Sequence, residues 1–336
     1  MKRTFRIYLS IFMILIIVSS CLKKDESEIN YETGFFPEET YNLEGINSTW
    51  DDFNVALPQL AGELPIMFSS NRNSQGSHFD ILTGFIYFAF SQVDAGFCIE
   101  SFMFHNYFYE SLEDKVNTDR DELGPYRLFN GENGIEYFFY AGANTLGSLN
   151  LKYLYYSPAN PDNSLFGQEP ADISALNSDS NDAYLCFDSD LSTVYLTNDG
   201  EGNFDIRQAE INKEMEFDAW LKGDPVSLSL TDSVNSAYDD KCPFVRDSIM
   251  IFTSDRPGGL GGFDLYYSIF RDGKWSSPFN MGPEINTEHN EYRPLIGNCP
   301  GFSNHFLLFS SDRPSGLGGY DLYFRGIDLK LLTGDS

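Results

Sequence analysis

The sequence repeats itself most clearly in IFTSDRPGGLGGFDLYYSIF, at residues 251–270, and in LFSSDRPSGLGGYDLYFRGI, at residues 308–327. Three weaker copies read MFSSNRNSQGSHFDIL (67–82), FFYAGANTLGSLNLKYLYYS (138–157) and YLTNDGEGNFDIRQAEI (195–211). Repetition at a period of tens of residues is typical of a fold assembled from one supersecondary unit. The chain is therefore predicted to contain five copies of such a unit.

A second motif precedes each copy and strengthens the repeat. It is an asparagine followed by Ser or Thr, with a carboxylate five positions after the asparagine. The asparagines are Asn47, Asn117, Asn177, Asn235 and Asn286, and the carboxylates are Asp52, Glu122, Asp182, Asp240 and Glu291. The spacing between successive asparagines falls from 70 to 51 residues along the chain. Two motifs in a fixed order indicate five repeats.

Each repeat contains four strand-like segments. In the C-terminal part of the chain these are RPLIG (293–297), FLLFSS (306–311) and YDLYFRGI (320–327), while KWSSPFNMG (274–282) shows the fourth type. Four antiparallel strands every 50–70 residues are typical of a β-propeller blade. The last repeat lacks its fourth strand, which the segment 35–43 can supply, joining the ring and removing two open edges. We predict an all-β, five-bladed propeller of four-stranded antiparallel blades, closed by an N-terminal strand.

The N-terminus resembles a lipoprotein signal peptide. A basic start at Lys2, Arg3 and Arg6 precedes an apolar stretch, residues 7–18, that is too short to cross a bilayer as a helix. The stretch VSSC then ends at Cys21, which the resemblance makes the lipidated residue. The predicted division is a signal peptide (1–20), a lipidated tether (21–34) and the propeller (35–336). An ordinary secretory signal or a short membrane anchor is the alternative.

The residues after Cys21 bear on location. Leu22 is not the Asp that resembles an inner-membrane retention signal, so the outer membrane is predicted, on either its periplasmic or its surface side. Without residues 1–20 the chain has 19 basic and 50 acidic residues, a net charge of −31. Such a charge repels nucleic acid and favours cations or a basic partner, although solubility alone also explains it.

The repeated carboxylates are the first candidate site. Fivefold symmetry would place Asp52, Glu122, Asp182, Asp240 and Glu291 in a ring around the channel, where oxygen ligands would suit Ca²⁺. The alternative is that each accepts hydrogen bonds within its own blade. The recurring pairs Asp255-Arg256 and Asp312-Arg313 are predicted to hold turns together, with the arginine pairing a carboxylate. In the second repeat Ala141-Gly142 is aligned with these pairs.

An aromatic segment is the second candidate site. Ten aromatic residues lie between positions 85 and 109, in a stretch that reads as an unusually long hairpin of the first blade. The surplus is predicted to form a contact surface for a protein or a glycan, with Phe88, Phe90, Phe102, Phe104 and Tyr107 as its residues. Enlarged packing within the blade is the alternative.

The cysteines and histidines indicate no further site. Cys98, Cys186, Cys242 and Cys299 could pair in an oxidising compartment, but the sequence leaves their disulfide state open. Cys186 and Cys242 occupy similar places in adjacent repeats, so a bridge between them and buried free thiols are both allowed. No nucleophile-elbow, zinc-protease or phosphate-loop motif is present.

The two C-terminal repeats, SDRPGGLGGFDLYYS (254–268) with GKWSSPFNMGPEINTEHNEYRP (273–294), resemble the TolB-type, WD-repeat-like propeller repeat. That resemblance implies a binding scaffold without catalytic residues. We therefore expect a lipid-anchored cell-envelope protein that binds a protein or glycan partner and is not an enzyme. The alternative is a carbohydrate-active enzyme of the glycosidase type with axial carboxylates, which would need two acids of different pKa.

Overall fold

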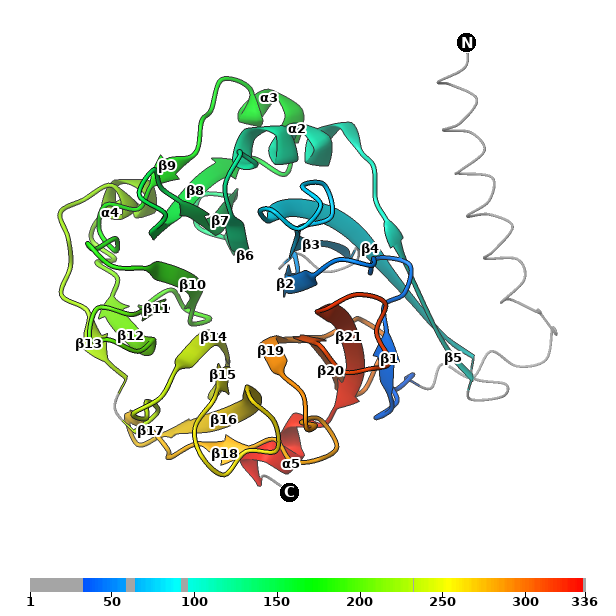
Figure 1. Cartoon of the computed structure of the whole chain (residues 1–336). Helices are drawn as coiled ribbons and strands as arrows, with labels where there is room; N and C mark the ends of the chain where they lie inside the picture. Colours follow the sequence, from blue (N-terminus) through cyan, green and yellow to red (C-terminus); the bar gives the residue numbers. More distant parts are fainter. Residues whose placement is uncertain (1–32, 59–63, 92–95, 232, 335–336) are drawn as a thin grey trace, which may run out of the picture. The chain divides into compact units, whose positions relative to one another are not determined.

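The computed structural model describes residues 33–58, 64–91, 96–231 and 233–334. Their strands form five antiparallel sheets arranged as blades around a central axis (Figure 1). The predicted five-bladed propeller is confirmed. The predicted signal peptide, Cys21 and most of the tether lie outside the described residues.

The first three blades each contain four strands, named from the axis outward. Blade 1 is β2 (Asp52–Ala56), β3 (Pro65–Ser70), β4 (Asp80–Ser91) and β5 (Gly96–Met103). Blade 2 is β6 (Glu122–Asn130), β7 (Ile135–Ala143), β8 (Leu149–Tyr156) and β9 (Ala171–Asp172). Blade 3 is β10 (Asp182–Phe187), β11 (Thr193–Asn198), β12 (Asp205–Glu210) and β13 (Ser229–Leu230).

The last two blades follow the same order with one addition. Blade 4 is β14 (Asp240–Arg246), β15 (Ile249–Ser254) and β16 (Asp264–Arg271), and β16 pairs with both β17 (Lys274–Trp275) and β18 (Phe279–Asn280). Blade 5 is β19 (Glu291–Gly297), β20 (His305–Ser311) and β21 (Asp321–Ile327), completed by β1 (Thr40–Asn42) from the start of the propeller.

The ring closes through β1. It runs antiparallel to β21, with Thr40 opposite Arg325 and Asn42 opposite Tyr323. Just before it, Phe36 is fully buried and stacks on Phe302 with 3.9 Å between ring centroids. The predicted closing strand is confirmed, and the edge of β21 is covered.

The second strand of each blade is almost wholly buried. Every residue of β3, β15 and β20 is buried or nearly so, and β11 is buried from its second residue onward. Neighbouring blades cover both faces of these strands, so the strands carry runs such as IMIFTS in place of strict alternation. This explains why the repeat is clearest around this strand in the sequence.

The described residues also form four short helices outside the blades. They are α2 (Tyr107–Val116), α3 (Pro161–Leu165), α4 (Phe217–Leu221) and α5 (Leu329–Thr333). The side chain of Asn106 caps α2 by accepting from the amide of Phe108 at 2.8 Å. In the part of the chain that the structure describes, none of the helices has the length and apolar character needed to span a bilayer.

Candidate functional site

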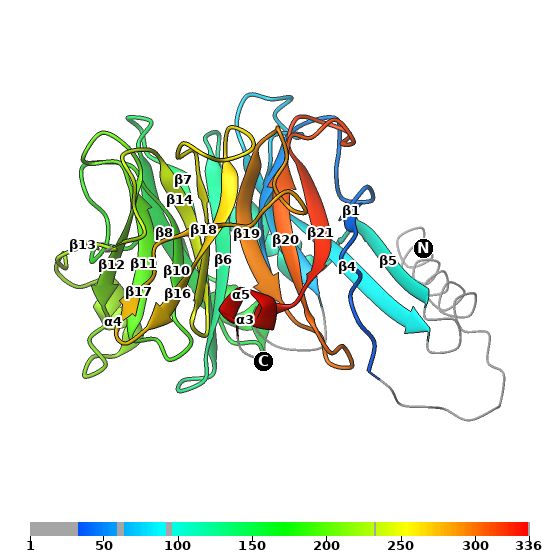
Figure 2. The same cartoon turned by 90° about the horizontal axis from the view of Figure 1, so that it is seen from below.

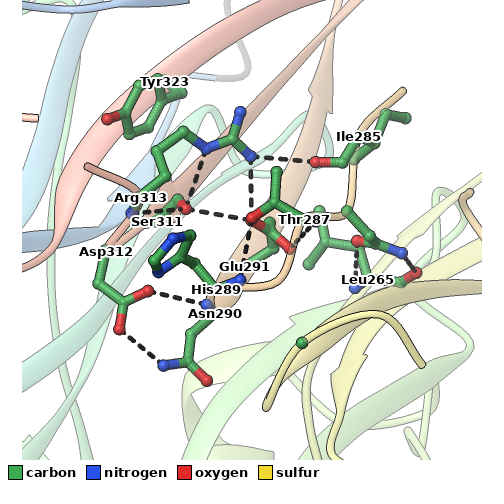
Figure 3. Close-up of polar contacts among 12 residues, drawn as sticks. Leu265, Ile285, Thr287, His289, Asn290, Glu291, Ser311, Asp312, Arg313 and Tyr323 are labelled. Carbon is green, nitrogen blue, oxygen red and sulfur yellow. Dashed lines mark hydrogen bonds and ion pairs between the residues drawn. The ribbon is translucent and has the colours of Figure 1, made fainter. Parts of the chain in front are cut away.

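The five repeated carboxylates occupy one position in the fold, the first residue of each innermost strand. Each is 0–2% exposed. In blade 5, Glu291 accepts from the amide of Thr287 at 2.9 Å, its hydroxyl at 2.7 Å and Arg313 at 3.0 Å (Figure 3). The other four accept from the equivalent Ser or Thr amide: Asp52 from Ser48, Glu122 from Thr118, Asp182 from Ser178 and Asp240 from Ser236.

Each carboxylate therefore has its hydrogen-bond donors within its own blade, which is the alternative that the sequence left open. Among the described residues, no group of three or more His, Cys, Asp or Glu side chains is placed to hold a metal ion. The axial Ca²⁺ site stays a prediction.

Three of the five carboxylates carry an arginine partner. Arg72 pairs with Asp52, Arg256 with Asp240 and Arg313 with Glu291. The same guanidinium groups also donate to the backbone carbonyl of the residue just before the repeated asparagine, as Arg313 does to Ile285 at 3.0 Å (Figure 3). The recurring Asp-Arg pairs thus join two motifs of one blade, as the sequence predicted.

Blades 2 and 3 lack this arginine. The strand pairing places Gly142 opposite Glu122 and Asn198 opposite Asp182, where the other blades have a serine. The Arg position is therefore Asn144 in blade 2, so the predicted alignment with Ala141-Gly142 was wrong by two residues. Asn198 donates to Asp182 at 2.7 Å. Burial raises the pKa of Glu122 to about 7.

A bulge lies two residues after each carboxylate, and we call the five bulges together the axial plug. The residues there are all in the left-handed region, with φ of 49–59°: Asn54, Gly124, Tyr184, Cys242 and Arg293. Arg293 of blade 5 reaches the carbonyl of Pro125 in blade 2 at 3.0 Å and lies 5.3 Å from the ring of Tyr184 in blade 3. None of the five bulge residues is an acid, so the innermost positions hold no carboxylate pair.

Next to the axial plug, at the C-terminal ends of the innermost strands, lies a cavity of about 900 Å³. Residues of all five innermost strands line it, from Val55 in β2 to Gly297 in β19. Apolar and polar surface contribute about equally to its walls, and Tyr126, Phe187 and Phe244 are among the lining side chains. The lining acids, from the turns of blades 2 to 4 and the segment before α4, are Glu132, Asp188, Asp190, Glu214, Glu216 and Asp247.

One of these acids is held firmly. Asp188 follows β10 and accepts from the amides of Ser192 at 2.7 Å and Thr193 at 3.1 Å and from the Ser192 hydroxyl at 2.5 Å. Asp247 follows β14 in a tight turn, with φ of 52°, and its side chain is exposed. The sequence reasoning missed both acids because they fall in turns outside the repeated motif.

The predicted aromatic residues do not form one surface. Phe88 packs against Phe36 and Phe324, with ring centroids at 5.1 and 5.3 Å. Phe90 contacts Phe35 and Phe302. These contacts join the long β4–β5 hairpin to the start of the propeller and to blade 5 (Figure 2).

The remaining three lie apart from that packing. Phe102 stacks on Phe85 at 5.3 Å, and Phe104 contacts Phe85 and Tyr109. Tyr107 begins α2 and is 73% exposed. The placement of Phe88 and Phe90 favours the alternative of enlarged packing, and the contact surface stays a prediction. Cys186, Cys242 and Cys299 are not in disulfides, and Cys186 and Cys242 are buried.

The fold is similar to that of several solved glycoside hydrolases. A thermostable family-43 glycoside hydrolase is 15% identical, with a TM-score of 0.50 over 85% of this chain and 91% of its own. A GH62 α-L-arabinofuranosidase from Coprinopsis cinerea is 12% identical, with a TM-score of 0.51 over 87% and 97%. An exo-β-1,3-galactanase from Phanerochaete chrysosporium is 13% identical, with a TM-score of 0.52 over 87% and 65%.

No protein-family model and no curated protein sequence matches the chain. At these identities the structural likeness shows the fold alone. It nevertheless corrects the functional expectation, which depended on the TolB-type resemblance: the similar structures named above are glycoside hydrolases. The interpretation as a non-enzymatic binding scaffold was wrong. The TolB-type resemblance finds support only at the level of the five-bladed propeller.

Proposed function

We propose that this chain is a carbohydrate-active enzyme of the glycoside-hydrolase type, and that its saccharide enters the axial cavity. The observation that carries the proposal is the cavity itself, about 900 Å³ in volume and lined by all five innermost strands. Ligand pockets of small molecules have volumes of about 300–1,000 Å³ and combine apolar walls with a few polar groups. The volume of the cavity lies in that range and is large enough for more than one sugar ring, and its walls combine apolar with polar groups.

The lining offers the groups that a sugar requires. The aromatic side chains Tyr126, Phe187 and Phe244 present flat apolar faces. Asn130, Asn212 and Asn298 are also lining residues and supply both donors and acceptors for sugar hydroxyls.

Hydrolysis requires two carboxyl groups on opposite sides of the scissile bond. The repeated axial acids are not available for this task, because each is buried and bonded within its blade. We assign the task to the cavity acids. Asp188, oriented by three hydrogen bonds, is our candidate for one acid, and Asp247 on the neighbouring blade is our candidate for the second.

The first experiment measures product release. The full-length protein is incubated with oligosaccharides built of α-L-arabinofuranosyl, β-1,3-galactosyl and uronic-acid units, and released sugars are separated by anion-exchange chromatography. We expect release from at least one of them, lowered about 100-fold or more in Asp188→Asn and in Asp247→Asn. Asp119→Asn is the matched control, because Asp119 is an exposed acid before β6, outside the cavity lining. Absence of any product, or full activity in both cavity variants, would contradict the proposal.

We further propose that the enzyme is tethered to the outer membrane through Cys21 and meets envelope glycans there. The support is the lipoprotein-like segment that ends in VSSC, together with an acidic mature chain that disfavours nucleic acid as a partner. Labelled palmitate should be incorporated into the wild-type chain and not into Cys21→Ser; equal labelling would exclude this anchor.

A further inference from the structure

Arg293 lies where the axial plug meets the cavity. It occupies the bulge of β19, with φ of 49°, and it is 5% exposed while lining the cavity. The bulge recurs in all five blades, so the fold determines the position of this side chain. The other blades place Asn, Gly, Tyr or Cys at the same position, and only blade 5 places a charge there.

The guanidinium group of Arg293 is only partly satisfied. Nη2 donates to the carbonyls of Pro125 at 3.0 Å and Gly124 at 3.5 Å. The group also lies over the ring of Tyr184. Within the described residues, the buried Nη1 has no hydrogen-bond partner. A buried donor without an acceptor is costly, and it indicates a group that is completed by something else.

Arg293 also differs in its charge environment from Arg127, which is buried to the same extent. Arg127, which also lines the cavity, forms an ion pair with Glu136 at 2.6 Å. Arg72, Arg256 and Arg313, in blades 1, 4 and 5, each pair with a carboxylate. No acid among the described residues forms an ion pair with Arg293.

The thiol next to Arg293 does not replace the missing charge. Burial raises the pKa of Cys242 to about 11, so this thiol is protonated and neutral at physiological pH. The remaining contacts are neutral carbonyls and an aromatic ring. Within the part of the chain that the structure describes, a buried cation therefore faces the cavity without an ion-pair partner, an arrangement that proteins otherwise avoid.

We propose that the inner end of the cavity is a carboxylate-binding site in which Arg293 receives the acidic group of a uronic acid residue. A carboxylate matches the planar guanidinium and would give Nη1 its missing acceptor. The sugar ring would then lie against the aromatic wall. That the carboxylate belongs to a saccharide rests on the proposed function, whereas the anion site rests on Arg293 alone.

The acids of the cavity do not oppose this binding. Five of the six lining acids are exposed, so water and salt screen their charges: Glu132, Asp190, Glu214, Glu216 and Asp247. The sixth, Asp188, accepts hydrogen bonds from the amides of Ser192 and Thr193. Arg293 is buried, and its attraction for a carboxylate is screened much less. A second cation on the wall, Arg246, donates to Ile296 at 3.3 Å and to Asn298 at 3.0 Å, and its Nε likewise has no partner among the described residues. Because its side chain is only half-buried, water weakens its attraction for a carboxylate, and it is the weaker candidate.

The test is direct binding, which does not depend on hydrolysis. Calorimetry compares D-galacturonate and D-glucuronate with the neutral sugars D-galactose and D-glucose on the full-length protein. We expect at least one uronate to bind, and at least tenfold more tightly than its neutral counterpart. Arg293→Met should remove that preference and Arg293→Lys should weaken it, because lysine keeps the charge but loses the planar pair of donors. Arg246→Met, the matched control in the same cavity, should retain it.

Circular dichroism and thermal unfolding establish whether each variant is folded. If Arg293→Met does not fold, Arg293→Lys alone tests the uronate preference. Equal affinity for uronate and neutral sugar, or an unchanged uronate preference in a folded Arg293 variant, would overturn the inference. Uronate binding without hydrolysis of any oligosaccharide would leave the site standing and refute the proposed enzyme. Hydrolysis of neutral oligosaccharides without uronate binding would support the proposed enzyme and refute the carboxylate site.

Discussion

Glu122 differs from the four residues that share its position in the fold. Three of those carboxylates pair with an arginine, and Asp182 accepts from the amide of Asn198. The backbone and hydroxyl of Thr118 donate to Glu122, but Gly142 stands opposite it and offers no side-chain donor. Removal from water without a cation favours the neutral form, which is why the pKa of Glu122 lies near 7. Blade 2 thus has, in place of the ion pair found in blades 1, 4 and 5, a carboxyl group whose pKa lies near neutrality.

Replacing Glu122 by Gln tests this exchange through the pH dependence of stability. The pKa of Glu122 in the folded protein is raised from 4.5 to about 7. Its contribution is therefore fully present below about pH 4.5 and is lost as the pH rises through about 7. The shift corresponds to about 3 kcal/mol in the free energy of unfolding. Because an amide does not titrate, the difference in stability between Glu122→Gln and wild type should change in favour of the variant between pH 5 and pH 8.

Urea unfolding at pH 5, 6, 7 and 8 measures this difference. The matched control is Asp240→Asn, which removes a carboxylate at the same position of blade 4 but leaves Arg256 without its partner. That variant should lose about 3 kcal/mol across the range, because breaking a buried ion pair leaves one charge uncompensated. Parallel stability curves for wild type and Glu122→Gln would show that Glu122 does not titrate in this window.

At the scale of single elements, the β4–β5 hairpin has a structural role that its composition did not reveal. Its strands run to 12 and 8 residues, and its far half extends away from the ring beside β1 (Figure 2). Phe88 and Phe97 of the hairpin both contact Phe36 and Phe324. The hairpin therefore covers the seam at which the two ends of the propeller meet. This role explains why blade 1 is longer than the others.

Phe88→Ala should accordingly destabilise the propeller. Loss of a large aromatic side chain from a packed cluster removes its buried area and leaves a void, and we expect the free energy of unfolding to fall by about 3 kcal/mol. Tyr107→Ala is the control, because Tyr107 is 73% exposed and its loss should change stability by less than about 0.5 kcal/mol. Chemical denaturation of both variants decides the matter. If Phe88→Ala is as stable as wild type, Phe88 does not stabilise the seam, and the contact-surface interpretation of the hairpin would be favoured.

For the whole molecule, symmetry determined what the sequence could predict. The repeated Asn and carboxylate positions predicted the number of blades, the start of every innermost strand and the closing strand, because these depend on contacts that recur in each blade. The predicted site followed the same symmetry and therefore selected residues such as Glu291 that serve the fold. Asp188 and Arg293 differ from their counterparts in the other blades. The sequence did mark Arg293, two residues after a repeated acid, but the aligned Asn54, Gly124, Tyr184 and Cys242 gave no reason to select it.

The closing strand makes the stability of the ring depend on residues at the two ends of the propeller. Deleting residues 34–43 would remove the pairing of β1 with β21 and the fully buried side chains of Phe36 and Leu43. Two such side chains contribute about 5 kcal/mol, so the melting temperature should fall by about 10 °C or more. The bare edge of β21 should also cause association at higher protein concentration.

A chain that ends at Asp328 provides the control. No residue of α5 is fully buried, and only Leu329 and Leu332 pack in part against the core, so the melting temperature should fall much less. A synthetic peptide of residues 33–45, added to the shortened chain, should restore much of the lost stability by pairing with β21. Scanning calorimetry and size-exclusion chromatography distinguish the outcomes. If the chain without residues 34–43 stayed monomeric and melted with the wild type, the remaining contacts between blades 1 and 5 would suffice to hold the ring. The N-terminal strand would then have to be explained by the tether that precedes it and not by closure.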